Sequence, residues 1–393
     1  MKIFMHEVNF GESILYQEGD YKLLVDCGAK CGRKGHLACE RVENKIDDNT
    51  QLLITHFDED HYNGIIQMPN TQKFNTIYLP LYIYAQKKLR NTEEMFIDVI
   101  KTWTYLIAAG KRKKINVLHS LFIKLPELVN SVYDIRCIGS GDQFFLEQRK
   151  VNVLWPHVDY KIRQKMYTNE ILQKLRDNIT NEQDKDLFEG FVTLADEYVK
   201  IFLDIYKFYC SNGSEDIAQD ITEENFSEKI KELKQTYEKL SKYPISIVLD
   251  KNAKTRINSV SSCNIKNMNE CSVIFEIDNE VIAFGDATER IIRYIASNRF
   301  SYNKYKVLKV QHHGTESYWS GDLPDANIYM ISNSGTDYLK WSIYKEYKED
   351  VDKKICCTND TFGRCENYNS DRRCAMCNVD IGKSEIMIDC SKI

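Results

Sequence analysis

Three apolar segments that lie far apart in the chain each end in histidine or aspartate, and no other feature of the sequence constrains the fold as strongly. The segments are QLLITHF (51–57), EVIAFGD (280–286) and YKVLKVQHHG (305–314). The polar residues at or just beyond their ends are His56, Asp58, Asp60, His61, Asp286, His312 and His313. A buried strand is rigid, and the loop at its C-terminal end can aim several side chains at one point. Imidazoles and carboxylates gathered in this way predict a site for divalent metal ions such as Zn²⁺ or Mn²⁺.

The spacing within the first cluster divides its side chains into two pairs. His56 and Asp58 are two residues apart, which keeps both on one side of an extended segment. Asp60 and His61 are adjacent, so they can address a second ion after the chain turns. We therefore expect ligands for two ions.

The order of predicted elements indicates two strand-rich parts separated by helices. Residues 1–80 and the chain from residue 246 onward, beginning with ISIVLD, read as strands joined by turns. Between them, residues 82–126 include a run with helical spacing, and residues 158–245 hold three charged, amphipathic segments typical of helices. Strands at both ends of a chain predict an α/β fold of the αβ/βα sandwich type. We assign 1–157 and 246–393 to that sandwich and 158–245 to a helical insertion, which acts as a lid or docks a protein partner.

Composition excludes two classes of protein. No run of about 18 apolar residues occurs, and the N-terminal segment lacks the apolar core of a secretory signal, so we expect a cytoplasmic protein without a membrane span. The formal net charge is −5, which argues against a uniformly basic nucleic-acid binder but leaves room for a local basic groove.

The chain has 13 cysteines, and in a cytoplasmic protein these do not predict a disulfide framework. The C-terminal cysteines include a CxxC pair, and they suggest a structural zinc site formed by Cys357, Cys365, Cys374 and Cys377. A second cluster with the same potential consists of Cys27, Cys31, His36 and Cys39. Free buried thiols are the alternative for both clusters.

Several motifs resemble one family in the same order along the chain. HFDEDH looks like the HxHxDH signature of the metallo-β-lactamase superfamily with Asp58 in place of the second histidine, and the resulting HxDxDH resembles the hydrolase domain of ComEC-type DNA-uptake proteins. EVNFGES and KLLVDCG resemble the opening strands of that group, and VNVLWPH, NECSVIFEI, FGD and KVQHHGT resemble its later ones. The resemblance implies a metallo-β-lactamase αβ/βα four-layer sandwich. Asn269 stands where the superfamily usually has a further histidine ligand.

The resemblance also implies how the residues share two divalent ions, Zn²⁺ or Mn²⁺. His56 and Asp58, with Asn269, would hold one ion. Asp60 and His61 would hold the other with either His312 or His313, and Asp286 would bridge the ions. Catalytic roles are expected for Asp60, His312 and His313, because the histidine that is not a ligand can act as general acid or bind substrate. Asp26 would orient a ligand histidine, and Lys309 would contact a substrate phosphate.

These residues predict a metal-dependent hydrolase. Two ions about 3.5–4 Å apart can lower the pKa of a shared water toward about 7 and neutralise charge on the substrate. The resemblance favours a phosphodiesterase or nuclease acting on nucleic acid or a nucleotide. The alternatives are a hydrolase of a small molecule, such as a cyclic nucleotide, an ester or a lactam, and an effector subunit controlled by a partner.

Overall fold

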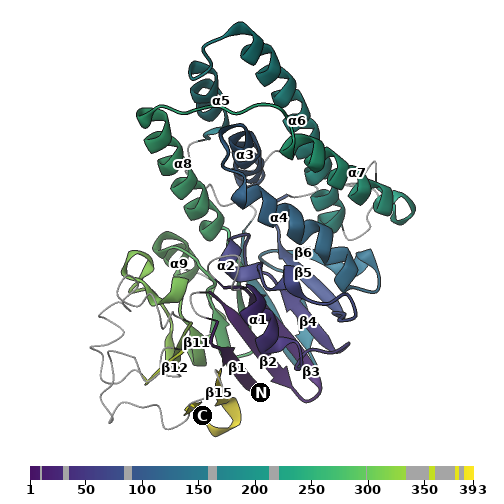
Figure 1. Ribbon diagram of the computed structural model, residues 1–393. Coiled ribbons are helices and arrows are strands. Elements are labelled where there is room, and N and C mark those ends of the chain that lie inside the picture. Colours follow the sequence, from purple (N-terminus) through teal and green to yellow (C-terminus); the bar gives the residue numbers. More distant parts are fainter. Residues whose placement is uncertain are drawn as a thin grey trace.

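A computed structural model describes residues 1–8, 11–29, 35–83, 91–157, 166–211, 221–297, 299–332, 354–358, 377–379 and 385–393 (Figure 1). The described chain contains two mixed β-sheets with helices outside them. Figure 1 shows most of the helices gathered beyond one end of the sheets, while the two termini lie close together near the other end.

The first sheet has eight strands in the order β14-β15-β1-β2-β3-β4-β5-β6. Its strands are β1 Lys2–His6, β2 Ser13–Glu18, β3 Tyr21–Cys27, β4 Thr50–Leu53, β5 Thr76–Pro80, β6 Ile135–Ile138, β14 Cys377–Val379 and β15 Glu385–Asp389. From β3 to β6 neighbouring strands are parallel, so their C-terminal ends meet at one edge of the sheet. The C-terminal β15 pairs antiparallel with β1.

The second sheet has seven strands in the order β13-β12-β11-β10-β9-β8-β7. Its strands are β7 Gln143–Leu146, β8 Arg149–Trp155, β9 Ile274–Ile277, β10 Val281–Ala283, β11 Lys304–Lys309, β12 Asp325–Ile331 and β13 Lys354–Cys357. The strands β10 and β11 are parallel and adjacent, which brings the segments after both strands to the same edge.

Three apolar clusters define a layered α/β sandwich. One contains side chains from both sheets, such as Ile14 and Leu53 from the first and Val153 and Phe275 from the second, and therefore lies between them. A second joins the outer face of the first sheet to most of the helices, and a third joins the second sheet to α9 (Glu289–Ala296). Alternate residues of a strand point to opposite faces, which lets each sheet contribute to two clusters.

The helical part of the structure is larger than the predicted insertion. Its helices are α3 Asn91–Tyr105, α4 Lys113–Lys124, α5 Thr168–Asp177, α6 Glu182–Ser211, α7 Glu223–Ser241 and α8 Lys251–Glu270. The remaining two α-helices among the described residues, besides α9, are α1 Gly35–Val42 and α2 Glu59–Tyr62. Helix α3, which lies outside residues 158–245, contacts α5 and α6 inside that range and also α8 beyond it. Figure 1 shows α3 to α8 together as one helical body.

One predicted strand is wrong. The segment ISIVLD forms no strand, and α8 follows it directly. Val248 is 81% exposed, while Ile247 and Leu249 are buried in the cluster that contains the helices and not in the one between the sheets. The Asp250 carboxylate instead accepts a hydrogen bond from the backbone N–H of Ala253 and caps α8. The other predicted elements are present. They are the strands within residues 1–80, 274–283 and 304–331 and the helices within 158–245.

The structure also bears on the predictions about disulfides and membrane-spanning helices. Cys137 of β6 and Cys210 of α6 form a disulfide, a pair that the sequence analysis did not predict. Within the described ranges, no helix is both long and apolar enough to cross a membrane.

Candidate metal centre

The segment after β4 carries the first cluster into a short helix. The Asp58 carboxylate accepts a hydrogen bond of 2.9 Å from the backbone N–H of Glu59 and caps α2. Asp60 and His61 then lie within α2, where the helical turn directs them differently from His56 and Asp58. His56 and Asp58 thus precede the helix, whereas Asp60 and His61 lie within it.

The segments after β10 and β11 are joined to each other through their backbones. The backbone N–H of His312 donates a 3.0 Å hydrogen bond to the carbonyl of Gly285. Gly285 has a φ of +47°, and a Cβ there would lie 2.3 Å from Ser272 Oγ. His312 and His313 also have positive φ, at 40° and 56°. Residues other than glycine rarely adopt this conformation, and such strain is concentrated at functional sites.

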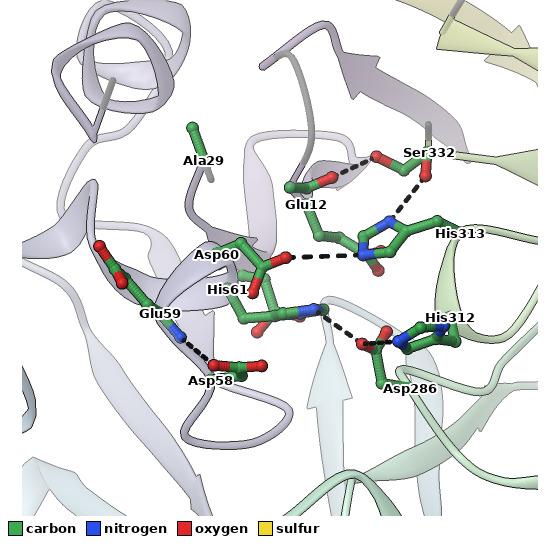
Figure 2. Close-up of polar contacts among 12 residues, drawn as sticks. Glu12, Ala29, Asp58, Glu59, Asp60, His61, Asp286, His312, His313 and Ser332 are labelled. Atoms are coloured by element: carbon green, nitrogen blue, oxygen red, sulfur yellow. Dashed lines mark hydrogen bonds and ion pairs between the residues drawn. The ribbon is translucent and has the colours of Figure 1, made fainter. Parts of the chain in front are cut away.

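Side chains from the three segments converge at one place (Figure 2). Ligand atoms of His56, His61 and Asp286 lie within 4.8 Å of one another, and the same limit holds for Asp60, His61 and His313. We call the first set the His56 position and the second the Asp60 position. Figure 2 shows Asp60, His61, Asp286 and both histidines of the pair facing a common centre.

Asp26 holds the ring of His61. Its carboxylate lies 2.7 Å from His61 Nδ1 and accepts hydrogen bonds from the backbone N–H and the hydroxyl of Thr55, at 2.8 and 2.7 Å. Both Asp26 and His61 are fully buried. With Nδ1 engaged in this way, Nε2 of His61 points to the centre, which is the orienting contact expected of Asp26.

Ser272 supports the opposite side of the centre and was not singled out from the sequence. Its hydroxyl lies 3.2 Å from His56 Nδ1 and accepts a 3.0 Å hydrogen bond from the backbone N–H of Asp286. One hydroxyl thus links two candidate ligands that are 230 positions apart, 286 − 56, in the sequence. The serine that ends the motif NECS is the only sequence signal for this role.

The structure distinguishes His312 from His313, which the sequence could not. His313 is buried, its Nδ1 lies 2.8 Å from the carbonyl of Ser332, and its Nε2 lies 3.8 Å from Asp60. His312 is 13% exposed at its side chain, and its Nε2 lies 3.7 Å from Asp286. His313 therefore belongs to the Asp60 position, whereas His312 lies beside Asp286 and belongs to neither set.

Asn269 reaches the centre through another side chain. It lies at the end of α8, and its amide donates a 3.2 Å hydrogen bond to the hydroxyl of Tyr318. The Tyr318 ring stacks on the His312 ring, with centroids 3.7 Å apart. Asn269 thus orients Tyr318 in this structure, and its role as a ligand stays a prediction.

Asp58 lies outside both sets of converging ligand atoms. It forms an ion pair with Lys114 of α4, whose side chain is 32% exposed. The adjacent Lys113 pairs with Glu59 at 2.8 Å. Two neighbouring lysines of the helical body therefore contact two neighbouring carboxylates of the metal-site loop.

Lys309 does not face an open substrate site. Both Lys309 and Glu12 are about 1% exposed, and they form a buried ion pair. A buried lysine requires such a partner, because an unpaired charge is strongly disfavoured in the interior. The position of Lys309 therefore gives the predicted phosphate contact no support.

The charges of the centre favour a cation. Burial and the neighbouring Asp58 carboxylate raise the pKa of Asp60 to about 7. Burial would lower the pKa of His61, but the Asp286 and Asp26 carboxylates raise it well above its usual value. Buried carboxylates thus draw protons into the centre, and a divalent cation would replace them.

The donor set fits such an ion. Among the described residues, Nε2 of His56, Nε2 of His61 and Oδ1 of Asp286 are buried and make no hydrogen bond. Buried polar atoms normally have partners, so three lone-pair donors at one centre indicate a bound group. Imidazole nitrogen with carboxylate oxygen suits Zn²⁺ or Mn²⁺.

The predicted cysteine sites remain untested. Cys365, Cys374 and the side chain of Cys377 lie outside the described residues, while Cys357 is buried at the end of β13. Cys27 and Cys39 are buried free thiols, and Cys31 also lies outside the described residues.

Comparison with known proteins yields two matches. A family described as "Anti-Pycsar protein Apyc1" matches residues 4–96. A curated relative, "Anti-Pycsar protein Apyc1" from Paenibacillus sp. (strain J14), is 24% identical over 163 residues, which is 41% of this chain and 57% of the relative. The chain is similar to anti-Pycsar proteins. It spans little more than half the length of that relative.

The family match includes the first cluster of the candidate centre but not its later part. Asp26, His56, Asp60 and His61 lie within residues 4–96, whereas Asp286 and the histidine pair lie outside them. These matches give the ComEC-type resemblance no support.

Proposed function

We propose that this protein has a metallo-β-lactamase fold and hydrolyses a cyclic nucleotide with the help of two divalent metal ions. The observation that carries the proposal is the convergence of ligand atoms in two sets, each within 4.8 Å. Each set joins the first segment to one of the two later segments, and the two sets together draw on all three. Similarity to anti-Pycsar proteins favours a cyclic nucleotide, which was an alternative in our sequence interpretation, over nucleic acid.

The layered sandwich is consistent with this fold. Both sheets contain a parallel section, and the candidate ligands follow the C-terminal ends of β4, β10 and β11. Rigid strands support such a centre, because ligands must be held within a fraction of an ångström.

In the proposed site His56 and Asp286 would hold one ion, and Asp60 and His313 would hold the other. His61 lies within reach of both, but it can supply Nε2 to only one of them, because Asp26 engages its Nδ1. When bound, the pair of ions makes a water more acidic and neutralises charge on phosphate oxygens. Hydrolysis adds this water to phosphorus and breaks one ester bond to the ribose. The product is a linear nucleoside monophosphate.

His312 is suited to deliver the proton that the departing ribose oxygen requires. Its Nδ1 lies 2.8 Å from Thr315 Oγ1, and its ring is fixed by stacking on Tyr318. These contacts leave Nε2 directed to the centre, 3.7 Å from Asp286. A positioned histidine of this kind typically contributes about 10²- to 10⁴-fold in rate.

The test is a hydrolysis assay with purified full-length protein and Mn²⁺ or Zn²⁺. A panel of 3′,5′-cyclic purine and pyrimidine nucleotides is incubated and analysed by chromatography for linear monophosphates. We expect turnover by wild type and its loss in Asp60→Asn. Single- and double-stranded DNA form a parallel arm. Cleavage of DNA with no turnover of any cyclic nucleotide would overturn the substrate assignment in favour of the nuclease.

A further inference from the structure

A buried ion pair joins the two sheets close to the metal centre. The ammonium group of Lys309, on β11 of the second sheet, contacts the carboxylate of Glu12, which directly precedes β2 of the first sheet. Both side chains are buried, and the proposed reaction uses neither charge. A buried pair generally adds little to stability compared with apolar side chains, because both ions lose their hydration. Its burial here therefore points to a role other than stability.

The backbone around Glu12 contacts the segment that carries Asp60. The N–H of Glu12 donates a 3.1 Å hydrogen bond to the carbonyl of Asp60, and the carbonyl of Glu12 accepts a 2.9 Å hydrogen bond from the N–H of Gly28. The approach is close, since a Cβ on Gly11 would lie 2.9 Å from the carbonyl oxygen of Asp60. Glu12 thus fixes the backbone from which the Asp60 side chain extends.

The same segment is also connected to His313. The hydroxyl of Ser332 donates a 2.8 Å hydrogen bond to the carbonyl of Gly11, and the carbonyl of Ser332 lies 2.8 Å from Nδ1 of His313 (Figure 2). Gly11 and Glu12 therefore contact, directly or through Ser332, two of the three residues of the Asp60 position.

Lys309 extends this connection to the other segments of the second sheet. It is the last residue of β11, and its Nζ lies 3.5 Å from the carbonyl of Gly285. The backbone N–H of His312 donates to the same carbonyl. One ammonium group thus lies between the Glu12 carboxylate of the first sheet and the segments that follow β10 and β11.

We propose that the Glu12–Lys309 pair is a positioning element that holds the two halves of the metal centre, one from each sheet, at the separation that ion binding requires. The inference rests on the proposed function, because it presumes that ions bind there. Neither side chain belongs to a converging ligand set. The pair instead fixes the backbone that carries Asp60 against the segments after β10 and β11, and this role replaces the predicted phosphate contact of Lys309.

The decisive variants remove both charges together, so that the net charge of the chain is unchanged. They are Glu12→Gln/Lys309→Met and, with different packing, Glu12→Met/Lys309→Met. The matched control is Glu280→Gln/Lys306→Met, which removes an ion pair of 3.2 Å beside the start of β10, at the end of that strand away from Asp286. Each full-length protein is stripped with a chelator, its thermal unfolding is recorded, and Zn²⁺ or Mn²⁺ is titrated by calorimetry.

The metal-free melting temperature of the double variants should stay close to that of the wild type, because no buried charge is left without a partner. Their affinity for metal should nevertheless fall by roughly 10- to 100-fold, as it does when other residues that hold ligands are replaced. The control should match the wild type in metal affinity. The single variants Glu12→Gln and Lys309→Met should unfold at a lower temperature than either double variant, since each leaves one buried charge unpaired.

Wild-type metal affinity in a folded double variant would overturn the inference, because the ligands would then be held in place without the pair. Failure of both double variants to fold would also overturn it, since the pair would then serve the fold itself. In both cases the turnover of cyclic nucleotides by the wild type, measured separately, decides the proposed function. A wild-type protein that binds no ion would overturn both.

Discussion

At the scale of single residues, the centre depends on side chains that hold the ligands. Asp26 fixes His61 through Nδ1, and Ser272 contacts both His56 and the backbone of Asp286. The sequence indicated Asp26, because it ends a strand in the same half of the chain. It did not indicate Ser272 or Lys114, because their contacts join residues whose proximity exists only after folding.

Replacing Asp26 tests this support. Asp26→Asn keeps the shape of the side chain but removes the charge that holds the Nδ1 proton of His61. We expect the affinity for metal to fall by roughly 10- to 100-fold, as for other partners of ligand histidines. Calorimetric titration measures this, with Asp20→Asn in the exposed turn before β3 as control. Equal metal affinity in Asp26→Asn and wild type would contradict the assigned role.

Gly285 is a second residue with a specific requirement. Gly285→Ala combines a φ of +47° with a Cβ 2.3 Å from Ser272 Oγ. We expect it to lower the free energy of unfolding by roughly 1–3 kcal/mol and to weaken metal binding, because Asp286 follows directly. Denaturant unfolding and metal titration measure the two effects.

The variant Gly110→Ala is a control that separates the backbone strain of a positive φ from steric crowding by the added Cβ. Gly110 also has a positive φ, of +72°, but a Cβ there would meet nothing within 4 Å. This control should lose only the backbone part, roughly 1–2 kcal/mol, and should bind metal normally. A loss of metal binding in Gly110→Ala would show that the effect is not local to the centre.

At the scale of elements, buried polar contacts join the helices of the helical body to one another. The Asp98 carboxylate of α3 accepts hydrogen bonds from the backbone N–H groups of Tyr167 and Thr168, where α5 begins. Asp98 is 6% exposed. These bonds satisfy donors that a helix N-terminus leaves without intrahelical partners.

Asp98→Ala should therefore lower the free energy of unfolding by about 1–3 kcal/mol, the penalty for buried donors left unsatisfied. Urea unfolding measures the change, and Asp186→Ala on the exposed surface of α6 is the control. If both variants lose equal stability, the assigned contact contributes nothing specific.

The sequence predicted strands and helices correctly where the pattern of buried apolar residues determines the type of element. The apolar runs of β3, β4 and β11 are strands in the structure, and the amphipathic α6 and α7 are helices. The prediction failed at α8, whose sequence NSVSSCNIKNMN is rich in residues that favour caps and turns over helices. Packing against α3 overrides this weak propensity. Asp250 was the available signal, because aspartate favours the first position before a helix.

At the scale of the whole molecule, bound metal should link folding to the centre. Candidate ligands come from both sheets, so an ion held there connects β4 with β10 and β11. Anything that binds only the folded state stabilises it, by about 2.7 kcal/mol at a free concentration 100 times the dissociation constant. Chelation should therefore lower the melting temperature, and added Zn²⁺ or Mn²⁺ should restore it.

Asp60→Asn is the matched variant for that experiment, because its melting temperature should respond less to the metal. The comparison is made by calorimetry in the same buffers. If neither the chelator nor added metal changed the melting temperature of the wild type, the link between metal binding and folding would be contradicted.

The central claim is that three segments of the chain share a pair of divalent ions, and anomalous diffraction tests it most directly. Crystals grown with excess Zn²⁺ are measured on both sides of the zinc absorption edge. The account predicts two anomalous peaks, one near His56 and Asp286 and the other near Asp60 and His313. A well-ordered centre that shows these side chains converging but no anomalous peak between them would contradict it.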